Sequence, residues 1–213
     1  MYYKIPIETS ARHLHLCRED FEKLFGEGKD LTPVKELSQP GQYLAKERLN
    51  VIGPKGMFKN VAIIGPLRSV TQMEISVTDA RKLGVPVVIR QSGDIDGTPG
   101  MTLVSDMGSV DLEEGIMVAK RHIHMTPKEA RRMKVKDNEE VFVVTESFDR
   151  SMIYGDVVVR VSDDYRLAMH IDTDEANALS GGEEAFGVIL KLFEGSNYNL
   201  HMWVEELLWG INR

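Results

Sequence analysis

Arg-His-Leu-His-Leu at residues 12–16 and Arg-His-Ile-His-Met at residues 121–125 are nearly the same pentapeptide, and they hold four of the six histidines in the 213-residue chain. In a β-strand, residues i and i+2 point to the same face. The two imidazoles of each pair can therefore reach one metal ion, while the apolar residue between them enters a core. Each pentapeptide predicts half of a metal site on a strand, and the duplication predicts two related halves.

A second duplicated block supports this division. Residues 73–80 and residues 169–176 share one pattern: the end of a strand, a polar helix cap, an acidic first turn and an alanine. The pattern places Glu74 and His170 at the same position of the two halves, and both side chains can bind a metal. Divergent tandem duplication explains both blocks. Each half therefore offers two histidines and a third ligand.

The rest of the sequence consists mainly of short strands separated by turns. Examples are residues 49–52, 61–64, 141–144 and 156–161. A helix is expected to begin after each His-x-His strand, and Thr126, Pro127 and Glu129 form the clearer start, a Thr-x-x-Glu capping box with proline at the first helical position. Cys17 occupies the matching cap position, where cysteine caps poorly. Small β-barrels or β-sandwiches with capping helices fit this pattern better than a parallel doubly wound sheet.

Two further stretches help to divide the chain. Residues 91–100 are rich in Gly, Asp and Pro, so we expect a boundary within residues 85–102. In the segment 200–213, apolar residues recur at i, i+3, i+4, i+7, i+8 and i+11. This spacing predicts an amphipathic C-terminal helix that packs on its own domain or a sister subunit, or docks on a separate partner.

Composition excludes several classes of protein. The net charge of −7 and the sequence pI of about 5.4 argue against a protein whose main partner is nucleic acid. A single cysteine excludes an intramolecular disulfide and fits a reducing compartment. The sequence shows no signal peptide and no apolar run of the roughly 20 residues that span a bilayer. We therefore expect a cytoplasmic protein without a membrane segment.

The expected ligand sets favour a catalytic metal site. Imidazole and carboxylate together suit Zn²⁺, with Fe²⁺, Co²⁺ or Mn²⁺ as alternatives. Three protein ligands per ion leave an open coordination position, as catalytic sites do. The alternative is that alternating histidines form a polar strand face or hydrogen-bonded core histidines, but two matched pairs favour metal binding.

Arg68 is a candidate for anion binding. It lies six residues before Glu74, and the second half has Asp164 at the equivalent position, so the arginine is not part of the shared scaffold. A guanidinium near a metal suits a bidentate grip on phosphate or carboxylate, whereas the alternative is a surface salt bridge. Walker, Gly-x-Ser-x-Gly and His-Glu-x-x-His motifs are missing, which argues against kinases, serine hydrolases and zincins.

Five segments together resemble one known family. They are Ser-Ala-Arg-His-Leu-His-Leu at 10–16, Gly-Pro-Leu-Arg-Ser-Val-Thr-Gln-Met-Glu-Ile-Ser at 65–76, Gln-Ser-Gly-Asp at 91–94, Arg-His-Ile-His-Met-Thr-Pro at 121–127 and His-Ile-Asp-Thr-Asp-Glu-Ala-Asn-Ala at 170–178. Over residues 5–186 the sequence closely resembles the PduL-type phosphate acyltransferases. These phosphotransacylases, the phosphate propanoyltransferase family, are associated with bacterial microcompartments.

The resemblance implies a mainly β fold. The expected architecture is a tandem-duplicated pair of small antiparallel β-barrels capped by short helices, followed by the C-terminal amphipathic helix. Residues 8–88 would form the first barrel repeat, residues 1–7 and 89–186 the second, and residues 187–213 the C-terminal extension.

The resemblance also implies a zinc-dependent phosphate acyltransferase. Such an enzyme moves a short acyl group, acetyl or propanoyl, directly between coenzyme A and phosphate at a site with two Zn²⁺ per chain. The ligands implied for one zinc, which also takes the coenzyme A sulfur, are His13, His15 and Glu74, and those for the other are His122, His124 and His170. Arg68 would hold phosphate, and Ser92 would lie near the coenzyme A arm.

The partners expected on this basis are acyl-CoA and phosphate, with no nucleic acid and no membrane. We expect a homo-oligomer, with a dimer as the first choice, and shell or lumen proteins of a microcompartment as further partners. The N-terminal targeting helix common in the family has no counterpart before residues 2–7, which leaves the C-terminal helix as the candidate targeting element. The alternative functions are a dinuclear zinc hydrolase of thioesters or phosphoesters and a non-catalytic metal-binding assembly protein.

Overall fold

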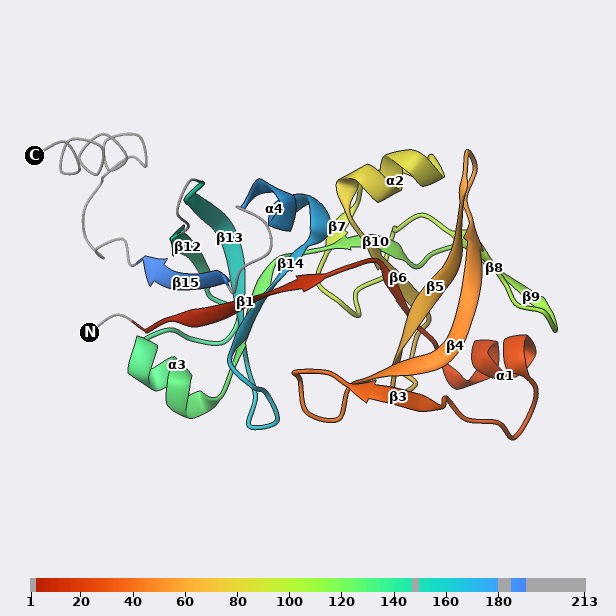
Figure 1. The fold of residues 1–213 in the computed structure, drawn as a ribbon, viewed down its shortest axis with the longest axis horizontal. Coiled ribbons are helices and arrows are strands. Elements are labelled where there is room, and N and C mark those ends of the chain that lie inside the picture. Colours follow the sequence, from red (N-terminus) through yellow and green to blue (C-terminus); the bar gives the residue numbers. More distant parts are fainter. Residues whose placement is uncertain (1–2, 147–149, 180–184, 191–213) are drawn as a thin grey trace, which may run out of the picture.

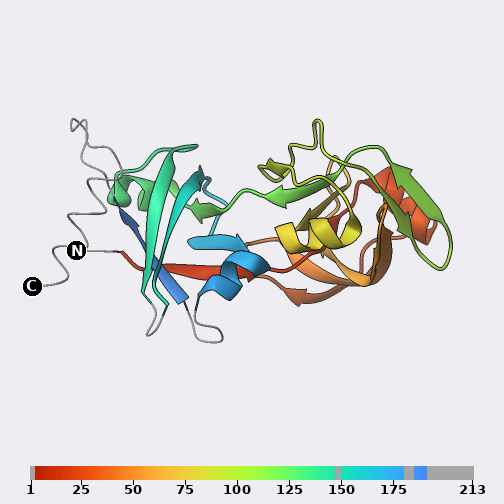
Figure 2. The same cartoon turned by 90° about the horizontal axis from the view of Figure 1, so that it is seen from above.

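The computed structural model describes residues 3–146, 150–179 and 185–190. Its strands form two sheets that lie side by side along the long axis of the molecule (Figure 1), and the view from above shows the same division (Figure 2). Each sheet has its own cluster of buried apolar side chains. The segment 200–213, for which an amphipathic helix is expected, lies outside the described residues.

One sheet closes on itself and is called here the closed barrel. Its strands, in spatial order, are β1 (Ile5–Ser10), β14 (Ala168–Asp172), β11 (His122–Met125), β13 (Met152–Val161), β12 (Glu140–Glu146) and β15 (Ala185–Leu190). The helices α3 (Pro127–Met133) and α4 (Thr173–Ala178) follow two of these strands. The alternating strand residues supply the core, as Val157 and Val159 do with no exposed surface.

The other sheet is curled but not closed and is called here the open sheet. Its strands, in spatial order, are β7 (Ile89–Arg90), β10 (Ile116–Ala119), β6 (Gln72–Ile75), β2 (His13–His15), β5 (Met57–Gly65), β4 (Tyr43–Ile52), β8 (Met101–Val104) and β9 (Ser109–Leu112), with β3 (Pro33–Glu36) paired to β4. The helices α1 (Arg18–Phe25) and α2 (Val77–Leu83) follow β2 and β6. The predicted mainly β fold with short helices is thus confirmed.

The duplication is visible in the strand pairing. In the open sheet, β2 lies between β5, to which it is parallel, and β6, to which it is antiparallel. In the closed barrel, β11 lies in the same way between β13, parallel, and β14, antiparallel. The pairing is therefore mixed and not wholly antiparallel as predicted. Parallel neighbours need long connections, and here α1, β3 and β4 connect β2 to β5, while α3 and β12 connect β11 to β13.

The strand before each His-x-His strand belongs to the opposite sheet. β1 lies between β14 and β15 in the closed barrel, and the chain then crosses to β2 in the open sheet. β10 lies beside β6 in the open sheet, and the chain then crosses to β11 in the closed barrel. Both His-x-His strands therefore begin where the two sheets meet (Figure 1).

The sheet membership of the strands differs from the predicted ranges. Residues 89–119 contain β7 to β10, which all lie in the open sheet, although they were predicted to belong to the second repeat. The turn-rich stretch 91–100 is a loop between β7 and β8, which both lie in that sheet. β15 extends to Leu190, past the predicted limit at residue 186. Whether the predicted ranges fold as domains stays a prediction.

The local signals at the helix starts are confirmed. Thr126 accepts a bond from the backbone N–H of Glu129, and the Glu129 side chain returns to the Thr126 backbone, with Pro127 at the first helical position. Cys17 makes no side-chain cap bond. Each helix in the described part of the chain is too short or too polar to span a lipid bilayer.

Candidate metal centre and anion site

The first predicted ligand set comes together on two neighbouring strands. His13 and His15 project from β2, and Glu74 on β6 is paired in register with His13. The two Nε2 atoms lie 3.2 Å apart, and the Glu74 carboxylate oxygens lie 3.6 Å from His13 Nε2 and 3.9 Å from His15 Nε2. All three residues are buried. We call this group the first cluster.

Backbone carbonyls orient both imidazoles of the first cluster. Nδ1 of His13 lies 2.8 Å from the Ala11 carbonyl oxygen, and Nδ1 of His15 lies 3.0 Å from that of Ile64. A carbonyl only accepts, so Nδ1 carries the proton and Nε2 of a neutral ring presents a lone pair. Burial, with His13 and Arg68 adding to it, lowers the pKa of His15 to about 3, so this ring is neutral at pH 7. Two such lone pairs at 3.2 Å fit a cation between them.

The carboxylate of Glu74 is held ionised. Burial alone raises the pKa of Glu74, but His13, His15, the Ser92 hydrogen bond and Arg68 together outweigh burial and lower it to about 2. Its Oε1 accepts a 2.6 Å hydrogen bond from the Ser92 hydroxyl and a 2.8 Å bond from Gln72 Nε2. Such partners fix the orientation of a ligand carboxylate.

The second predicted set, called the second cluster, consists of His122 and His124 on β11 and His170 on β14. His122 is paired in register with His170, and the ring centroids of the three lie 4.6 to 5.2 Å apart. His122 Nδ1 donates to the carbonyl of Lys120, two residues before it, as His13 does to Ala11. In both clusters one ligand atom per residue lies within 4.8 Å of the others. The two halves thus build the same arrangement.

The second cluster is neutral and incompletely bonded. Burial, with His170, lowers the pKa of His122 to about 4, and burial, with His122 and His170, lowers the pKa of His124 to about 2. Within the described part of the chain, the buried Nδ1 of His124 has no hydrogen-bond partner. A buried nitrogen of this kind is costly unless something binds it. Three neutral imidazoles are a donor set that suits Zn²⁺.

Arg68 reaches the first cluster through Ser92. Its Nη1 donates a 2.9 Å hydrogen bond to Ser92 Oγ, the same hydroxyl that donates to Glu74. Among the described residues Arg68 makes no ion pair with a carboxylate, so nothing there supports the alternative of a surface salt bridge. Burial lowers the pKa of Arg68, and the negative charge of Glu74 offsets part of this effect. The guanidinium is thus a partly desolvated cation at the edge of the cluster, where it could bind an anion.

Ser92 lies deeper in the site than the sequence suggested. Its hydroxyl accepts from Arg68 and from Gln72 Nε2 at 2.9 Å, in addition to donating to Glu74. Gln72 also holds the neighbouring loop, because its Oε1 accepts from the Gly93 backbone at 2.8 Å. Ser92 therefore links Arg68 to a ligand, and its contact with a coenzyme A arm stays a prediction.

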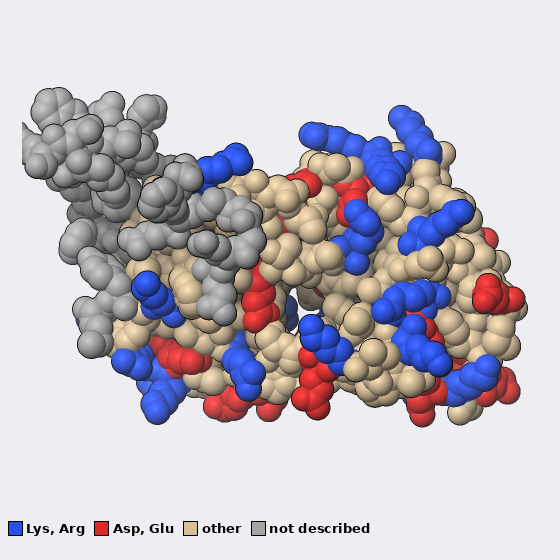
Figure 3. All heavy atoms as spheres, in the orientation of Figure 1, with Lys and Arg blue, Asp and Glu red and all other residues tan. Residues whose placement is uncertain are grey.

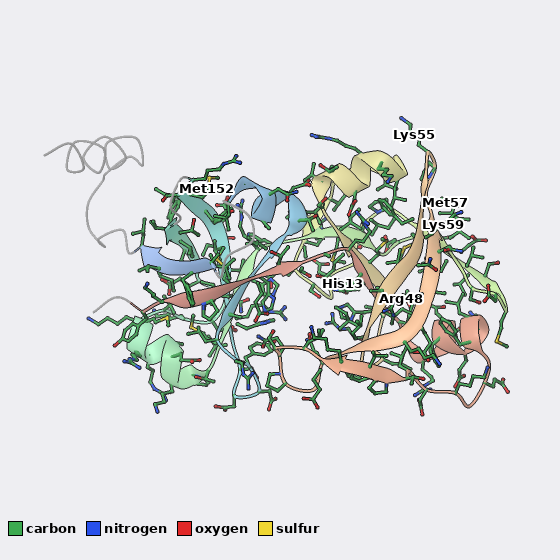
Figure 4. The ribbon with its side chains drawn as sticks, viewed as in Figure 1. His13, Arg48, Lys55, Met57, Lys59 and Met152 are labelled. Atoms are coloured by element: carbon green, nitrogen blue, oxygen red, sulfur yellow. The ribbon has the colours of Figure 1, made fainter. Side chains whose placement is uncertain are left out.

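Both clusters border one cavity of about 650 Å³ between the sheets. Its wall includes all six predicted ligands, Arg68 and Ser92. Figure 3 shows a hollow between the two halves of the molecule, bordered by acidic and basic side chains, and Figure 4 shows His13 where the halves meet. The two ligand sets predicted from separate repeats thus border one cavity.

The structure adds residues that the sequence did not reveal. Arg160, paired in register with His124, lines the cavity from the closed barrel, and the Tyr165 ring packs at a tilt against His124 with 4.2 Å between ring centroids. Gln39, in the loop between β3 and β4, donates to the Arg166 carbonyl at 2.9 Å and lies 3.5 Å from Nε2 of His170. Alternation in the strand 156–161 could have indicated Arg160, but no local signal marks a loop glutamine that reaches the other half.

The fold and the site define a class of protein: a β protein of two related halves that places two three-residue clusters and two half-buried arginines around a shared cavity. The family model described as phosphate propanoyltransferase matches residues 6–181. The chain belongs to this family.

Curated relatives agree with the match. The chain is 55% identical over 174 residues to the phosphate propanoyltransferase of Thermotoga maritima, which covers 82% of this chain and 83% of the relative. It is 51% identical over 187 residues to that of Clostridioides difficile, covering 88% and 89%. The phosphate propanoyltransferase of Salmonella typhimurium is 51% identical over 174 residues, 82% of each chain. These relatives bear the name of an acyltransferase, which confirms the predicted family and class of enzyme.

Proposed function

We propose that this protein is a phosphate acyltransferase that interconverts short-chain acyl-CoA plus phosphate with acyl phosphate plus coenzyme A, at a site that holds two Zn²⁺. Family membership supports the reaction. The observation that carries the site is that two clusters of metal-ligand type and Arg68 face a single cavity. Acetyl and propanoyl groups are the expected acyl groups.

The two clusters would hold the metal ions. The first offers two Nε2 lone pairs and an ionised carboxylate, and the second offers three neutral imidazoles, one with an unsatisfied buried nitrogen. Both sets suit Zn²⁺ and leave a position for substrate. Zinc bound there would supply a Lewis acid that favours a thiolate and offsets negative charge on oxygen.

The protein's own side chains bring phosphate to the thioester. Arg68, without a carboxylate partner among the described residues, can donate two N–H groups to phosphate. Arg160 faces the cavity from the opposite half, so the anion is met by positive charge from both sheets. A phosphate oxygen then attacks the acyl carbonyl carbon, the C–O bond forms, the C–S bond breaks and the thiolate leaves. No covalent acyl-enzyme is needed.

Metal analysis tests the proposed site. The purified protein should hold two zinc ions per chain, and the His122→Ala/His124→Ala variant should hold one. The matched control is His201→Ala, which changes the one histidine outside both clusters; it should hold two. Removal of the metal by a chelator should abolish acyl transfer, and added Zn²⁺ should restore it. Full activity in a metal-free protein would contradict the proposal.

The expected assembly and location are also part of this proposal. A homo-oligomer, a dimer as first choice, and encapsulation with microcompartment shell or lumen proteins rest on the resemblance. The full chain is compared with a chain that ends at residue 194. Light scattering measures the number of subunits, and cell fractionation measures the location. An unchanged number of subunits and an unchanged location would leave the C-terminal segment without a targeting or assembly role.

A further inference from the structure

The arginine that opens each Arg-His-x-His pentapeptide takes no part in either cluster. Arg12 precedes His13, and Arg121 precedes His122, so the two arginines are as well matched as the ligands. Within the part of the chain that the structure describes, neither side chain forms a hydrogen bond or ion pair with a cluster residue. A duplicated residue that is not a ligand needs its own explanation.

In the open sheet, Arg12 joins β2 to both of its neighbours. Its Nε and Nη2 each donate a 2.8 Å hydrogen bond to the carboxylate of Asp79, in the first turn of α2, just after the strand that carries Glu74. Its guanidinium also lies 4.3 Å from the ring centroid of Phe58, on β5. The Asp79 side chain is only 5% exposed, whereas that of Arg12 is 43% exposed, so the two-pronged ion pair closes over a buried carboxylate from the surface.

In the closed barrel, Arg121 makes the equivalent contacts. Its Nη1 lies 3.3 Å from Oε1 of Glu175, in the first turn of α4, and its guanidinium lies 5.6 Å from the ring centroid of Tyr154, on β13. The Tyr154 hydroxyl also donates a 2.7 Å hydrogen bond to the carbonyl of Glu175. The three residues therefore form a connected group.

The two groups match position by position. Asp79 and Glu175 each follow the third ligand by five residues, and Phe58 and Tyr154 each precede it by sixteen. The acid and the aromatic residue differ in kind between the halves, and the contacts are closer in the open sheet, with two 2.8 Å hydrogen bonds against one 3.3 Å ion pair, but the partners occupy the same positions. An arginine, an acid and an aromatic residue thus recur around each cluster.

We infer that Arg12 and Arg121 are positioning residues, each of which clamps the His-x-His strand to the strand of the third ligand and so sets the geometry of its own cluster. β2 is three residues long and β11 is four, so few ladder bonds fix their register. A slip by one residue would turn the histidines away from the cavity. The clamp fixes that register from outside the cluster. This inference rests on the proposed function, because it assumes that the clusters bind metal.

Zinc affinity measured one cluster at a time tests the clamps. The first cluster is isolated with His122→Ala/His124→Ala and the second with His13→Ala/His15→Ala, and each protein then receives Arg12→Gln or Arg121→Gln. Competition with a chromogenic chelator should show that Arg12→Gln weakens zinc binding at the first cluster by about 10- to 100-fold and leaves the second nearly unchanged. Arg121→Gln should do the reverse.

Two further variants control for misfolding and for a nonspecific effect of removing an arginine. Arg12→Lys keeps the charge without the two-pronged bond, should fold if Arg12→Gln does not, and should give an intermediate loss. Arg18→Gln removes an exposed arginine that pairs with Asp30 at 2.6 Å on the same half, and should change neither affinity.

The results that would overturn the inference are distinct. Equal weakening of both clusters by either arginine variant would mean a general loss of stability. Unchanged zinc affinity with a raised KM for acyl-CoA in Arg12→Gln would mean that Arg12, which also borders the cavity, contacts substrate instead. A wild-type protein without zinc affinity would overturn the proposed function and the clamps together, whereas unchanged affinity in variants of a zinc-binding protein overturns the clamps alone.

Discussion

At the scale of single residues, the site depends on which ring nitrogen each histidine presents. Carbonyls of Ala11, Ile64 and Lys120 accept from Nδ1 of three of the five cluster histidines, so the backbone fixes the tautomers of these three rings. Ala11 and Lys120 lie two residues before the first histidine of each His-x-His strand, so the chain that enters the strand supplies the acceptor in both halves. These three histidines are therefore oriented before any metal binds.

Arg68 gives the first residue-scale prediction. Arg68→Ala should raise the KM for phosphate by on the order of 10- to 100-fold, because a charged hydrogen-bonding group contributes about 1.5–3 kcal/mol. The zinc content should not change, because Arg68 contacts Glu74 only through Ser92. Arg68→Lys should give a smaller rise. Steady-state kinetics with varied phosphate measure this, and an unchanged phosphate KM would remove Arg68 from the role.

The buried His15 predicts how the metal-free protein responds to pH. Its pKa is lowered from 6.5 to about 3, mainly by burial, so the unfolded chain binds more protons between these values. The stabilising contribution is complete above pH 6.5 and is lost as the pH falls toward 3, with a loss of about 2 kcal/mol by pH 5. Urea unfolding of the metal-free protein at pH 7 and pH 5 should show this loss, and His15→Gln should show a smaller one. Equal losses in both proteins would contradict it.

The residues that sequence reasoning could identify are those whose role repeats or has a fixed spacing. His13, His15 and Glu74 meet, as do the histidines of the second half, because the duplicated pattern encodes both strands. Gln39 and the link through Ser92 could not be predicted, because they arise where loops from distant parts of the chain meet. Ligands that lie on regular strands can be predicted from the local sequence pattern. Contacts between loops at the junction of the two sheets cannot.

At the scale of elements, the short helices are defined by their first turns. α3 and α4 both start with a capping box, at Thr126 and Asp172, and α2 starts at Ser76, whose hydroxyl accepts from Asp79. α1 starts at Cys17 without a side-chain cap bond. Each of these helices follows a ligand strand, so a cap also fixes where that strand ends. Strand and helix boundaries near the site were therefore predictable from the caps.

The cap of α3 provides the element-scale prediction. Thr126→Ala removes the oxygen that accepts from the Glu129 N–H, and should lower the free energy of unfolding by about 1 kcal/mol. Thr126→Ser keeps the oxygen and should recover most of the loss. Urea unfolding of the two variants beside the wild type measures the difference. Equal stability of the alanine and serine variants would show that the capping bond contributes nothing.

At the scale of the whole molecule, the strand that precedes each His-x-His strand belongs to the opposite sheet, an arrangement called here the strand exchange. Because β1 belongs to the closed barrel and β10 to the open sheet, the chain crosses the junction before each His-x-His strand. This brings four histidines to one cavity. The sequence revealed the duplication but not the exchange, because β1 and β10 read like any short strand. Which sheet such a strand joins is decided by distant partners, so the crossing after residue 119 could not be predicted from the local sequence.

The exchange predicts that the N-terminal strand is essential to the second half. Ile5 on β1 has no exposed surface and packs in the core of the closed barrel, so Ile5→Ala should lower the free energy of unfolding by about 2–5 kcal/mol. The matched control is Ile153→Ala in the same barrel, which is 46% exposed and should change stability by about 0.5 kcal/mol or less. Equal effects of the two substitutions would contradict the placement of β1.

The most direct test of the proposed reaction is thiol release from acetyl-CoA or propanoyl-CoA, measured with and without phosphate. A two-zinc phosphate acyltransferase should release coenzyme A only when phosphate is present, with one acyl phosphate formed for each thiol. Release at the same rate without phosphate would instead identify a thioester hydrolase built on the same six ligands. No release under either condition would identify a metal-binding protein without this catalysis, and either result would contradict the proposed function.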